Sequence, residues 1–306
     1  MSEKIKKRKI MLVGTGFVGM SFAYSMLSEK GIDELVLVDV NEDKAKGEQM
    51  DLNDGLVYAD TKMKISAGTY ADAADTNIVG AAQKPGQTRL DLVKINANIT
   101  KGVCKALKEN NFNGILVVAN NPVDIMTYVA WKESGLPKNH VIGSGTVLDT
   151  ARLRHALSER LGFADSNIHA YIMGEHGDSS FVPWIHSYIG CKNLLEYLDE
   201  NNISLSELQE IYIDVRDKAY KIIELKRATY YGIGLALKRI VSCILNNERA
   251  ILPVSAYQNG GTPSVVGSNG VEQVIRLHLN ENDQQRFDHS FDTLKNTIEE
   301  NLQDIL

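Results

Sequence analysis

The stretch "MLVGTGFVGMSFAY", residues 11–24, carries three glycines in a GxGxxG spacing, directly after an apolar run and at the start of a segment with helical periodicity. The first glycine allows a tight turn, the second lets the backbone approach a pyrophosphate, and the third lets helix and strand pack closely. The following helix offers free N–H groups and its positive dipole end to phosphate. The stretch therefore predicts a dinucleotide site formed by Gly14, Gly16, Phe17, Val18 and Gly19.

GxGxxG alone is weak evidence, because glycine turns without a ligand are common. Here a carboxylate supports it: Asp39 ends the second apolar run, 20 residues after Gly19. At that spacing a carboxylate accepts hydrogen bonds from a ribose diol. The same charge would repel a 2′-phosphate, so the sequence favours NAD over NADP.

Short apolar runs alternate with helical segments in the first half of the chain. Runs that are apolar on both faces and separated by helices indicate buried parallel strands. We therefore expect an α/β fold that begins with a doubly wound Rossmann sheet. The apolar runs are Ile10–Val13, Leu35–Val38 and Ile115–Ala119, and the helical segments are Phe17–Glu29 and Asn98–Glu109.

The second half has a different pattern, with long helices around short β-like segments. Helices are expected at 146–161, 204–224 and 226–247, and a strand within Val271–Leu279. This pattern predicts an α+β domain. We place the boundary near residue 143, so that residues 1–143 form an NAD-binding domain and residues 144–306 a substrate domain.

Composition places the chain among ordinary soluble globular proteins, with 306 residues, 43% of them hydrophobic and 24% charged. A net charge of −6 argues against a nucleic-acid binder, whose surface is normally basic. The apolar run after the N-terminal lysines is too short for a signal peptide or a membrane span. Three widely spaced cysteines without CxxC pairing suit a reducing compartment. We expect a cytoplasmic protein.

Three longer motifs are far more specific than the glycines. They are "QKPGQTRLDLV" (83–93), "NNPVDIMTYVAWKESGLPKNHVIGSGTVLDTARLR" (120–154) and "HAYIMGEHGD" (169–178). Over nearly its whole length the chain resembles the bacterial L-lactate dehydrogenases of the lactate/malate dehydrogenase family. The resemblance implies a Rossmann domain followed by an α/β substrate domain, NAD as cofactor, interconversion of L-lactate and pyruvate, and a homotetramer.

Hydride transfer between an alcohol carbon and nicotinamide requires a base for the hydroxyl proton and a cation for the substrate carboxylate. His176 in "GEHGD" is the natural base, because histidine titrates near neutrality. Asp149 and Arg152 are three residues apart, so they share one face of a helix. The resemblance implies that Asp149 orients His176 and that Arg152 forks onto the substrate carboxylate. In a sequence without these motifs, the same Asp–Arg pair would indicate a surface salt bridge.

Other substrate contacts come from the resemblance alone. It implies that Arg89 lies on a loop that closes over substrate and polarises the carbonyl, and that Asn121, before a cis Pro122, contacts substrate and nicotinamide. Thr229 and Ile233 match positions that line the substrate site and pack on the nicotinamide. For these two, ordinary core packing is nearly as good an interpretation.

Gln83 bears on the substrate class. Malate dehydrogenases carry arginine at the matching position, where it pairs with a second carboxylate. A neutral glutamine leaves such a charge unpaired, which is costly when buried. The sequence favours pyruvate over oxaloacetate, and longer 2-oxoacids remain open.

Arg154 lies two positions after Arg152, about 200° around a helix, and cannot serve the same pocket. With His169 it matches the pair that binds fructose 1,6-bisphosphate at the subunit interface of allosteric bacterial lactate dehydrogenases. We expect this sugar bisphosphate to be an activator. The alternative is an exposed arginine and an unrelated histidine.

The chain is shorter than its relatives at two places, between Val79 and Gly80 and between Tyr257 and Gly261. A central strand that lost residues would lose ladder hydrogen bonds and core contacts. We hypothesise that residues near 79/80 and 258–261 are absent from the sequence as written rather than from the molecule. The resemblance implies a cofactor contact at Gly80 and Ala81, directly after the first of these places.

Two further classes remain open: an L-2-hydroxyacid dehydrogenase of broader side-chain tolerance, and a non-catalytic NAD-binding or structural protein that reuses the fold. The residues His176, Asp149, Arg152 and Arg89 together argue against the second class. No metal site is expected, since none of the seven histidines falls in an HxH or HExxH spacing.

Overall fold

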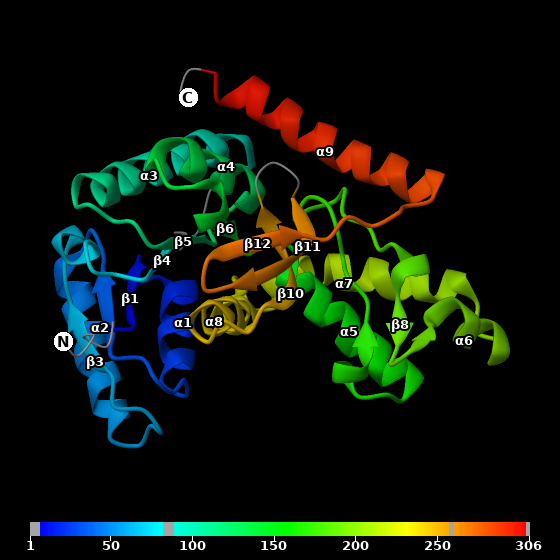
Figure 1. The fold of residues 1–306 in the computed structure, drawn as a ribbon, viewed down its shortest axis with the longest axis horizontal. Coiled ribbons are helices and arrows are strands. Elements are labelled where there is room, and N and C mark those ends of the chain that lie inside the picture. Colours follow the sequence, from blue (N-terminus) through cyan, green and yellow to red (C-terminus); the bar gives the residue numbers. More distant parts are fainter. Residues whose placement is uncertain (1–6, 82–88, 257–259, 304–306) are drawn as a thin grey trace, which may run out of the picture.

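A nine-stranded sheet runs through the middle of the molecule (Figure 1). The computed structural model describes residues 7–81, 89–256 and 260–303. In spatial order the strands are β12 (Gly270–Val274), β11 (Gly261–Gly267), β10 (Ala250–Ala256), β6 (Val141–Gly143), β5 (Ile115–Val118), β4 (Ile78–Ala81), β1 (Lys9–Val13), β2 (Glu34–Val38) and β3 (Lys64–Ala67).

The six strands from β3 to β6 are parallel, with β1 paired to β2 on one side and to β4 on the other. This confirms the predicted Rossmann sheet. The three strands of the second half are antiparallel and join the same sheet, because β10 pairs with β6. One continuous sheet thus runs through both halves of the chain.

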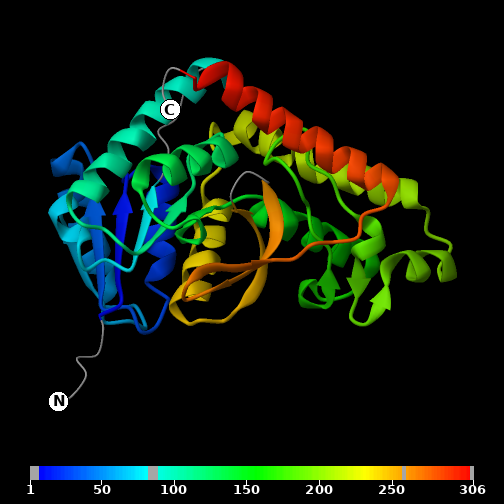
Figure 2. The same ribbon diagram turned by 45° about the horizontal axis from the view of Figure 1, so that its top comes forward.

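Helices cover both faces of the sheet, which is why β1 and β2 are buried along their whole length. Ile10 and Leu12 pack on one face, and Met11 and Val13 on the other. The first face is covered by α1 (Phe17–Met26), α2 (Glu42–Leu56) and α8 (Tyr231–Leu245). The second is covered by α3 (Arg89–Glu109), α4 (Val123–Ser134) and α9 (Glu281–Asn301), with α3 and α9 visible along the top of Figure 2.

A second, smaller core lies in the substrate half. It is formed by α5 (Val147–Leu161), α6 (Leu194–Glu200), α7 (Leu205–Lys226) and a three-stranded sheet of β7 (Ile168–His169), β8 (Tyr188–Ile189) and β9 (Lys192–Asn193). Buried leucines such as Leu153 and Leu208 fill it. The mixture of helices and antiparallel strands agrees with the expected α+β organisation of the second half.

The sequence as written forms a paired strand across the first shortened position. Val79 and Gly80 are consecutive residues of β4, which pairs in register with Met11 and Leu12 of β1 and, on its other side, with β5. Gly80 and Ala81 form the second half of the strand. The hypothesis that further residues lie at 79/80 stays a prediction. The second junction includes residues 257–259, which lie outside the described residues.

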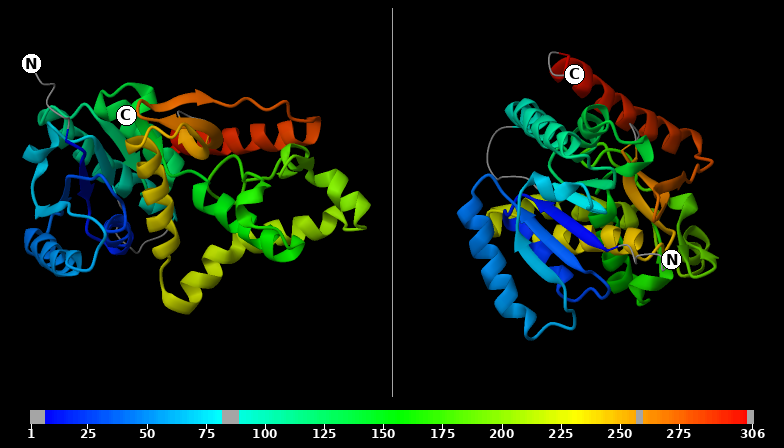
Figure 3. Two further views of the ribbon diagram at one scale, coloured as in Figure 1. Left: turned by 60° about the horizontal axis from the view of Figure 1, so that its bottom comes forward. Right: turned by 60° about the vertical axis from the view of Figure 1, so that its left-hand side comes forward.

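Three element boundaries differ from expectation by five residues or more. The helix expected from residue 98 begins at Arg89, and the strand expected to reach Leu279 ends at Val274. The helix expected over 226–247 begins only at Tyr231, because α7 ends at Lys226 and residues 227–230 form a bend between the two helices (Figure 3, left). Within the described ranges, no helix is both long and apolar enough to cross a membrane.

Candidate active site

The glycine turn links β1 to α1 as the GxGxxG spacing predicts. Gly14 has a φ of +98°, a backbone conformation that favours glycine. A Cβ on Gly19 would lie 2.1 Å from the Gly14 carbonyl oxygen, so only glycine allows helix and turn to approach this closely. Gly16 precedes the first helical residue and has no side chain to cap the helix. The first N–H groups of α1 are therefore available to a phosphate.

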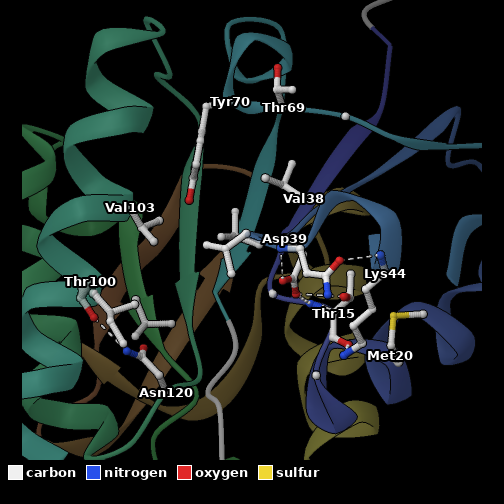
Figure 4. Close-up of a pocket in the computed structure, with 18 of the residues that line it drawn as sticks. Thr15, Met20, Val38, Asp39, Lys44, Thr69, Tyr70, Thr100, Val103 and Asn120 are labelled. Atoms are coloured by element: carbon white, nitrogen blue, oxygen red, sulfur yellow. Dashed lines mark hydrogen bonds between the residues drawn. The ribbon is translucent and has the colours of Figure 1, made fainter. Parts of the chain in front are cut away.

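Asp39 lies beside this turn, at the end of β2. Its Oδ2 accepts hydrogen bonds from the Thr15 amide at 2.7 Å and from the Thr15 hydroxyl at 2.9 Å, and its Oδ1 accepts one from the Asn41 amide at 3.0 Å (Figure 4). Burial acts to raise the pKa of Asp39, but these bonds and nearby Lys44 outweigh it, so the pKa is lowered. A fixed, ionised carboxylate is what a ribose diol requires as an acceptor.

A cavity of about 870 Å³ opens above the turn and Asp39. Its lining includes Gly14, Gly16, Phe17 and Asp39, and Figure 4 shows Tyr70 reaching into it from the 3₁₀ turn Tyr70–Ala73. Size, the glycine cradle and the ionised carboxylate all fit NAD. Of the other expected cofactor contacts, Val18 packs partly buried against the core, and Gly80 lies within β4 and does not line this cavity.

The catalytic candidates converge at the start of α5. His176 Nδ1 lies 2.6 Å from Asp149 Oδ2, and Arg152 Nη1 donates to Asp149 Oδ1 at 3.2 Å. The side chains of Asp149 and Arg152 are 15% and 11% exposed, whereas that of His176 is 30% exposed. The imidazole is therefore held at Nδ1 by a largely buried carboxylate, and the histidine side chain as a whole remains partly exposed.

These contacts set the protonation of the pair. The negative charge of Asp149 raises the pKa of His176 to about 9, against the opposing effects of burial and of the Arg152 charge. Burial acts to raise the pKa of Asp149, but the positive charges of His176 and Arg152 lower it overall. At neutral pH the imidazole is protonated on both nitrogens. Nδ1–H donates a hydrogen bond to the carboxylate, and Nε2 carries a proton that it can transfer to substrate.

A buried carboxylate that the sequence analysis missed holds the same histidine from another helix. Asp124 Oδ2 accepts the backbone N–H of His176 at 2.7 Å, and its Oδ1 accepts the hydroxyl of Ser255 on β10. Burial raises the pKa of Asp124, although these two hydrogen bonds oppose the rise. The available signal was one acidic residue inside the otherwise apolar run "VDIMTYVA" of α4.

The remaining substrate-site candidates lie in other segments of the chain. The Asn121–Pro122 peptide bond is cis, as the resemblance implied, and the Asn121 carbonyl accepts from Asn96 Nδ2 at 2.6 Å. Thr229 lies in the bend before α8, not on a helix, and Ile233 is partly buried in the first turn of α8. Arg89, which was expected on a loop, is instead the first residue of α3, because the helix begins earlier than its sequence pattern indicated. Gln83 lies outside the described residues.

Arg154 belongs to a different surface from Arg152. Its Nε donates to the Ala170 carbonyl at 3.1 Å, and its guanidinium lies 4.7 Å from the centre of the Tyr171 ring. The exposed His169 is the chain neighbour of Ala170. Arg154 and His169 therefore lie near each other. Within the described residues, no group of three or more His, Cys, Asp or Glu side chains is arranged to hold a metal ion.

Comparison with known proteins defines the class. Residues 8–143 match the NAD-binding domain of lactate/malate dehydrogenases, and residues 146–305 match the alpha/beta C-terminal domain of the same enzymes. The chain belongs to the lactate/malate dehydrogenase family and is an NAD-dependent oxidoreductase.

Within that family the chain is similar to L-lactate dehydrogenases. It is 48% identical to the enzyme of Geobacillus sp. (strain WCH70), over 97% of this chain and 98% of the relative. The crystal structure of the minor L-lactate dehydrogenase from Enterococcus mundtii, in its ligands-bound form, superposes with a TM-score of 0.92 at 45% identity, over 96% and 98% of the two chains. A deep-sea metagenome lactate dehydrogenase gives 0.91 at 47% identity, over 96% and 99%.

Proposed function

We propose that this chain is an L-lactate dehydrogenase that interconverts L-lactate and pyruvate with NAD, and that His176 is its proton carrier. The observation that carries the proposal is the double use of Asp149, which binds His176 Nδ1 on one oxygen and Arg152 on the other. One carboxylate thus fixes a proton donor and a guanidinium next to each other. A 2-oxoacid carries a carbonyl and a carboxylate on adjacent carbons, so a neighbouring proton donor and guanidinium can bind both groups of one molecule.

When bound, NAD accepts or supplies the hydride of this reaction. The glycine turn and Asp39 would hold it. In the direction of pyruvate reduction, His176 Nε2 donates its proton to the oxygen of the forming alcohol, and in lactate oxidation it takes that proton back. Asp149 keeps Nδ1 protonated and stabilises the imidazolium, which places the positive charge where negative charge develops on the substrate oxygen.

Arg152 grips the substrate carboxylate through a planar fork of donors. Arg89 would polarise the carbonyl, while Asn121 and Thr229 would border the substrate. A neutral Gln83 suits a substrate with one carboxylate. A broader L-2-hydroxyacid dehydrogenase would share all these groups and would differ only in the room for the substrate side chain.

A substrate panel tests this function. NADH oxidation assayed with pyruvate, oxaloacetate and 2-oxoisocaproate is expected to be fastest with pyruvate, because oxaloacetate brings a second charge that Gln83 cannot pair. NADPH is expected to be a poor substitute, since Asp39 repels its 2′-phosphate. Preference for 2-oxoisocaproate would favour the broader enzyme. Turnover of none of the three would favour a non-catalytic NAD-binding protein.

We also propose that the chain assembles as a homotetramer in the cytoplasm. Large apolar side chains on neighbouring helices support an assembly: Tyr24 on α1 is 71% exposed, and Leu235 on α8 is 59% exposed. Free cysteines support a reducing compartment: in the part of the chain that the structure describes, Cys104, Cys191 and Cys243 form no disulfide.

Fructose 1,6-bisphosphate is the proposed activator, bound through Arg154 and His169 of facing subunits. Two cationic groups that meet across an interface repel until a phosphate lies between them, so the effector stabilises the active assembly. Millimolar effector is expected to lower the KM for pyruvate. Arg154→Gln is expected to abolish the response, and Arg160→Gln, farther along α5, to keep it. A pyruvate saturation curve that is unchanged by the effector at every pH tested would refute the site.

A further inference from the structure

The turn that carries His176 is held by its backbone from three directions. Three consecutive N–H groups leave the turn and reach three elements that are far apart in the sequence. The bonds run from Gly174 N to Gly261 O on β11 at 2.9 Å, from Glu175 N to Ser290 Oγ on α9 at 2.6 Å, and from His176 N to Asp124 Oδ2 on α4 at 2.7 Å.

We propose that Ser290 is a positioning residue for His176, and that the C-terminal helix α9 thereby takes part in catalysis through this hydroxyl. The inference rests on the proposed role of His176. Ser290 is 1% exposed, so its bond to the Glu175 N–H is shielded from water. A buried N–H that loses its acceptor is destabilising, and a short turn can relieve this only by moving.

Ser290 also belongs to a closed set of polar contacts. Ser179 Oγ lies 3.1 Å from Ser290 Oγ and donates to Glu175 Oε2 at 2.6 Å. Residues 175 and 179, on either side of His176, are therefore tied to each other and to α9. The histidine turn lies close against α9, since a Cβ on Gly174 would lie 2.5 Å from Ser290 Oγ.

This arrangement separates positioning from ordinary stabilisation. The charged groups around the imidazole are Asp149 and Arg152 on α5, Asp124 on α4 and the neighbouring Glu175. If the turn moves, the imidazole moves away from Asp149. Its pKa then falls, and its orientation toward the substrate changes. A residue that merely stabilises the fold changes the amount of native enzyme and leaves the pH dependence where it was.

The test compares three variants of the full-length chain by kcat, KM, pH profile and Tm. Ser290→Ala is expected to lower kcat for pyruvate reduction roughly tenfold, since a displacement of about 1 Å costs up to 10²-fold, and to move the alkaline limb to lower pH. The KM for NADH is expected to stay unchanged. Ser290→Thr, which keeps the hydroxyl, is expected to recover most of the rate. Thr297→Ala is the matched control, because its hydroxyl bonds only to the Thr293 carbonyl of the same helix.

The inference is overturned if Ser290→Ala keeps the wild-type kcat, or if kcat falls without displacement of the limb. Should Ser290→Ala fail to fold, Ser179→Ala decides in its place, with a smaller shift in the same direction expected and an unmoved limb contradicting the inference. Failure of the role proposed for His176 has a different signature. In that case His176→Gln would itself remain active, whereas an inactive His176→Gln with an unaffected Ser290→Ala would refute only the role of Ser290.

Discussion

Replacing His176 by glutamine is expected to lower kcat for pyruvate reduction about 10³-fold, in the range that a positioned general acid contributes. Glutamine can still donate a hydrogen bond to the substrate carbonyl, but it cannot give up a proton. Binding of NADH is expected to change little, because the glycine turn and Asp39 lie apart from His176. Stopped-flow measurement of NADH oxidation at saturating pyruvate separates the chemical step from product release.

The matched control is His289→Gln. His289 is exposed on α9, next in sequence to Ser290 but outside the cluster around Asp149. Its replacement is expected to leave kcat within a factor of two, about 0.4 kcal/mol in activation free energy. If His176→Gln retained a tenth of the wild-type rate, the proton would have to come from another group, and the assignment of the reaction to this cluster would be wrong.

Replacing Arg152 by lysine is expected to lower kcat/KM for pyruvate about 10²- to 10³-fold, mainly through KM, because an ammonium cannot bind a carboxylate through two parallel bonds. The substitution keeps the charge, so a loss of this size would identify the fork geometry as the requirement. It also removes the 3.2 Å bond to Asp149, which is expected to reduce kcat as a secondary effect. Initial rates over a wide range of pyruvate concentration distinguish the effect on KM from the effect on kcat.

Arg160→Lys on the same helix is the control. Arg160 is exposed and pairs with Glu207, a contact that a lysine can also make. An exposed ion pair contributes little to stability because solvent screens it, so this variant is expected to match wild type in kcat/KM. Equal KM values for Arg152→Lys and wild type would show that the substrate carboxylate binds elsewhere.

Local patterns in the sequence were sufficient for the Rossmann half of the fold. The glycine turn, the apolar run before it and Asp39 are all encoded within 31 residues, from Lys9 to Asp39, and each acts on its neighbours. The limits of β4 were not predictable in the same way. They depend on pairing with β1 and β5, which supply partners for Gly80 and Ala81 that the local sequence does not reveal.

The candidate site shows the same division. Asp149 and Arg152 were found because a helix brings residues three apart to one face, and His176 because of its motif. Asp124 and Ser290 were missed because they reach the histidine turn from 52 and 115 residues away. Such contacts form only when α4 and α9 pack over the sheet, and a single sequence carries no signal for the pairing itself.

The central claim is that the imidazole of His176, held by Asp149, carries the proton. A group whose pKa is raised to about 9 is protonated below that pH. Pyruvate reduction is therefore expected to lose kcat/KM as pH rises through about 9, and lactate oxidation to gain it.

The most direct measurement is this pair of pH profiles for wild type and for Asp149→Asn. Removal of the carboxylate is expected to move both limbs about one to three pH units lower, as for other groups that lose a neighbouring opposite charge. Limbs that stay near pH 9 in Asp149→Asn would contradict the account, because the group that titrates there would then be independent of Asp149.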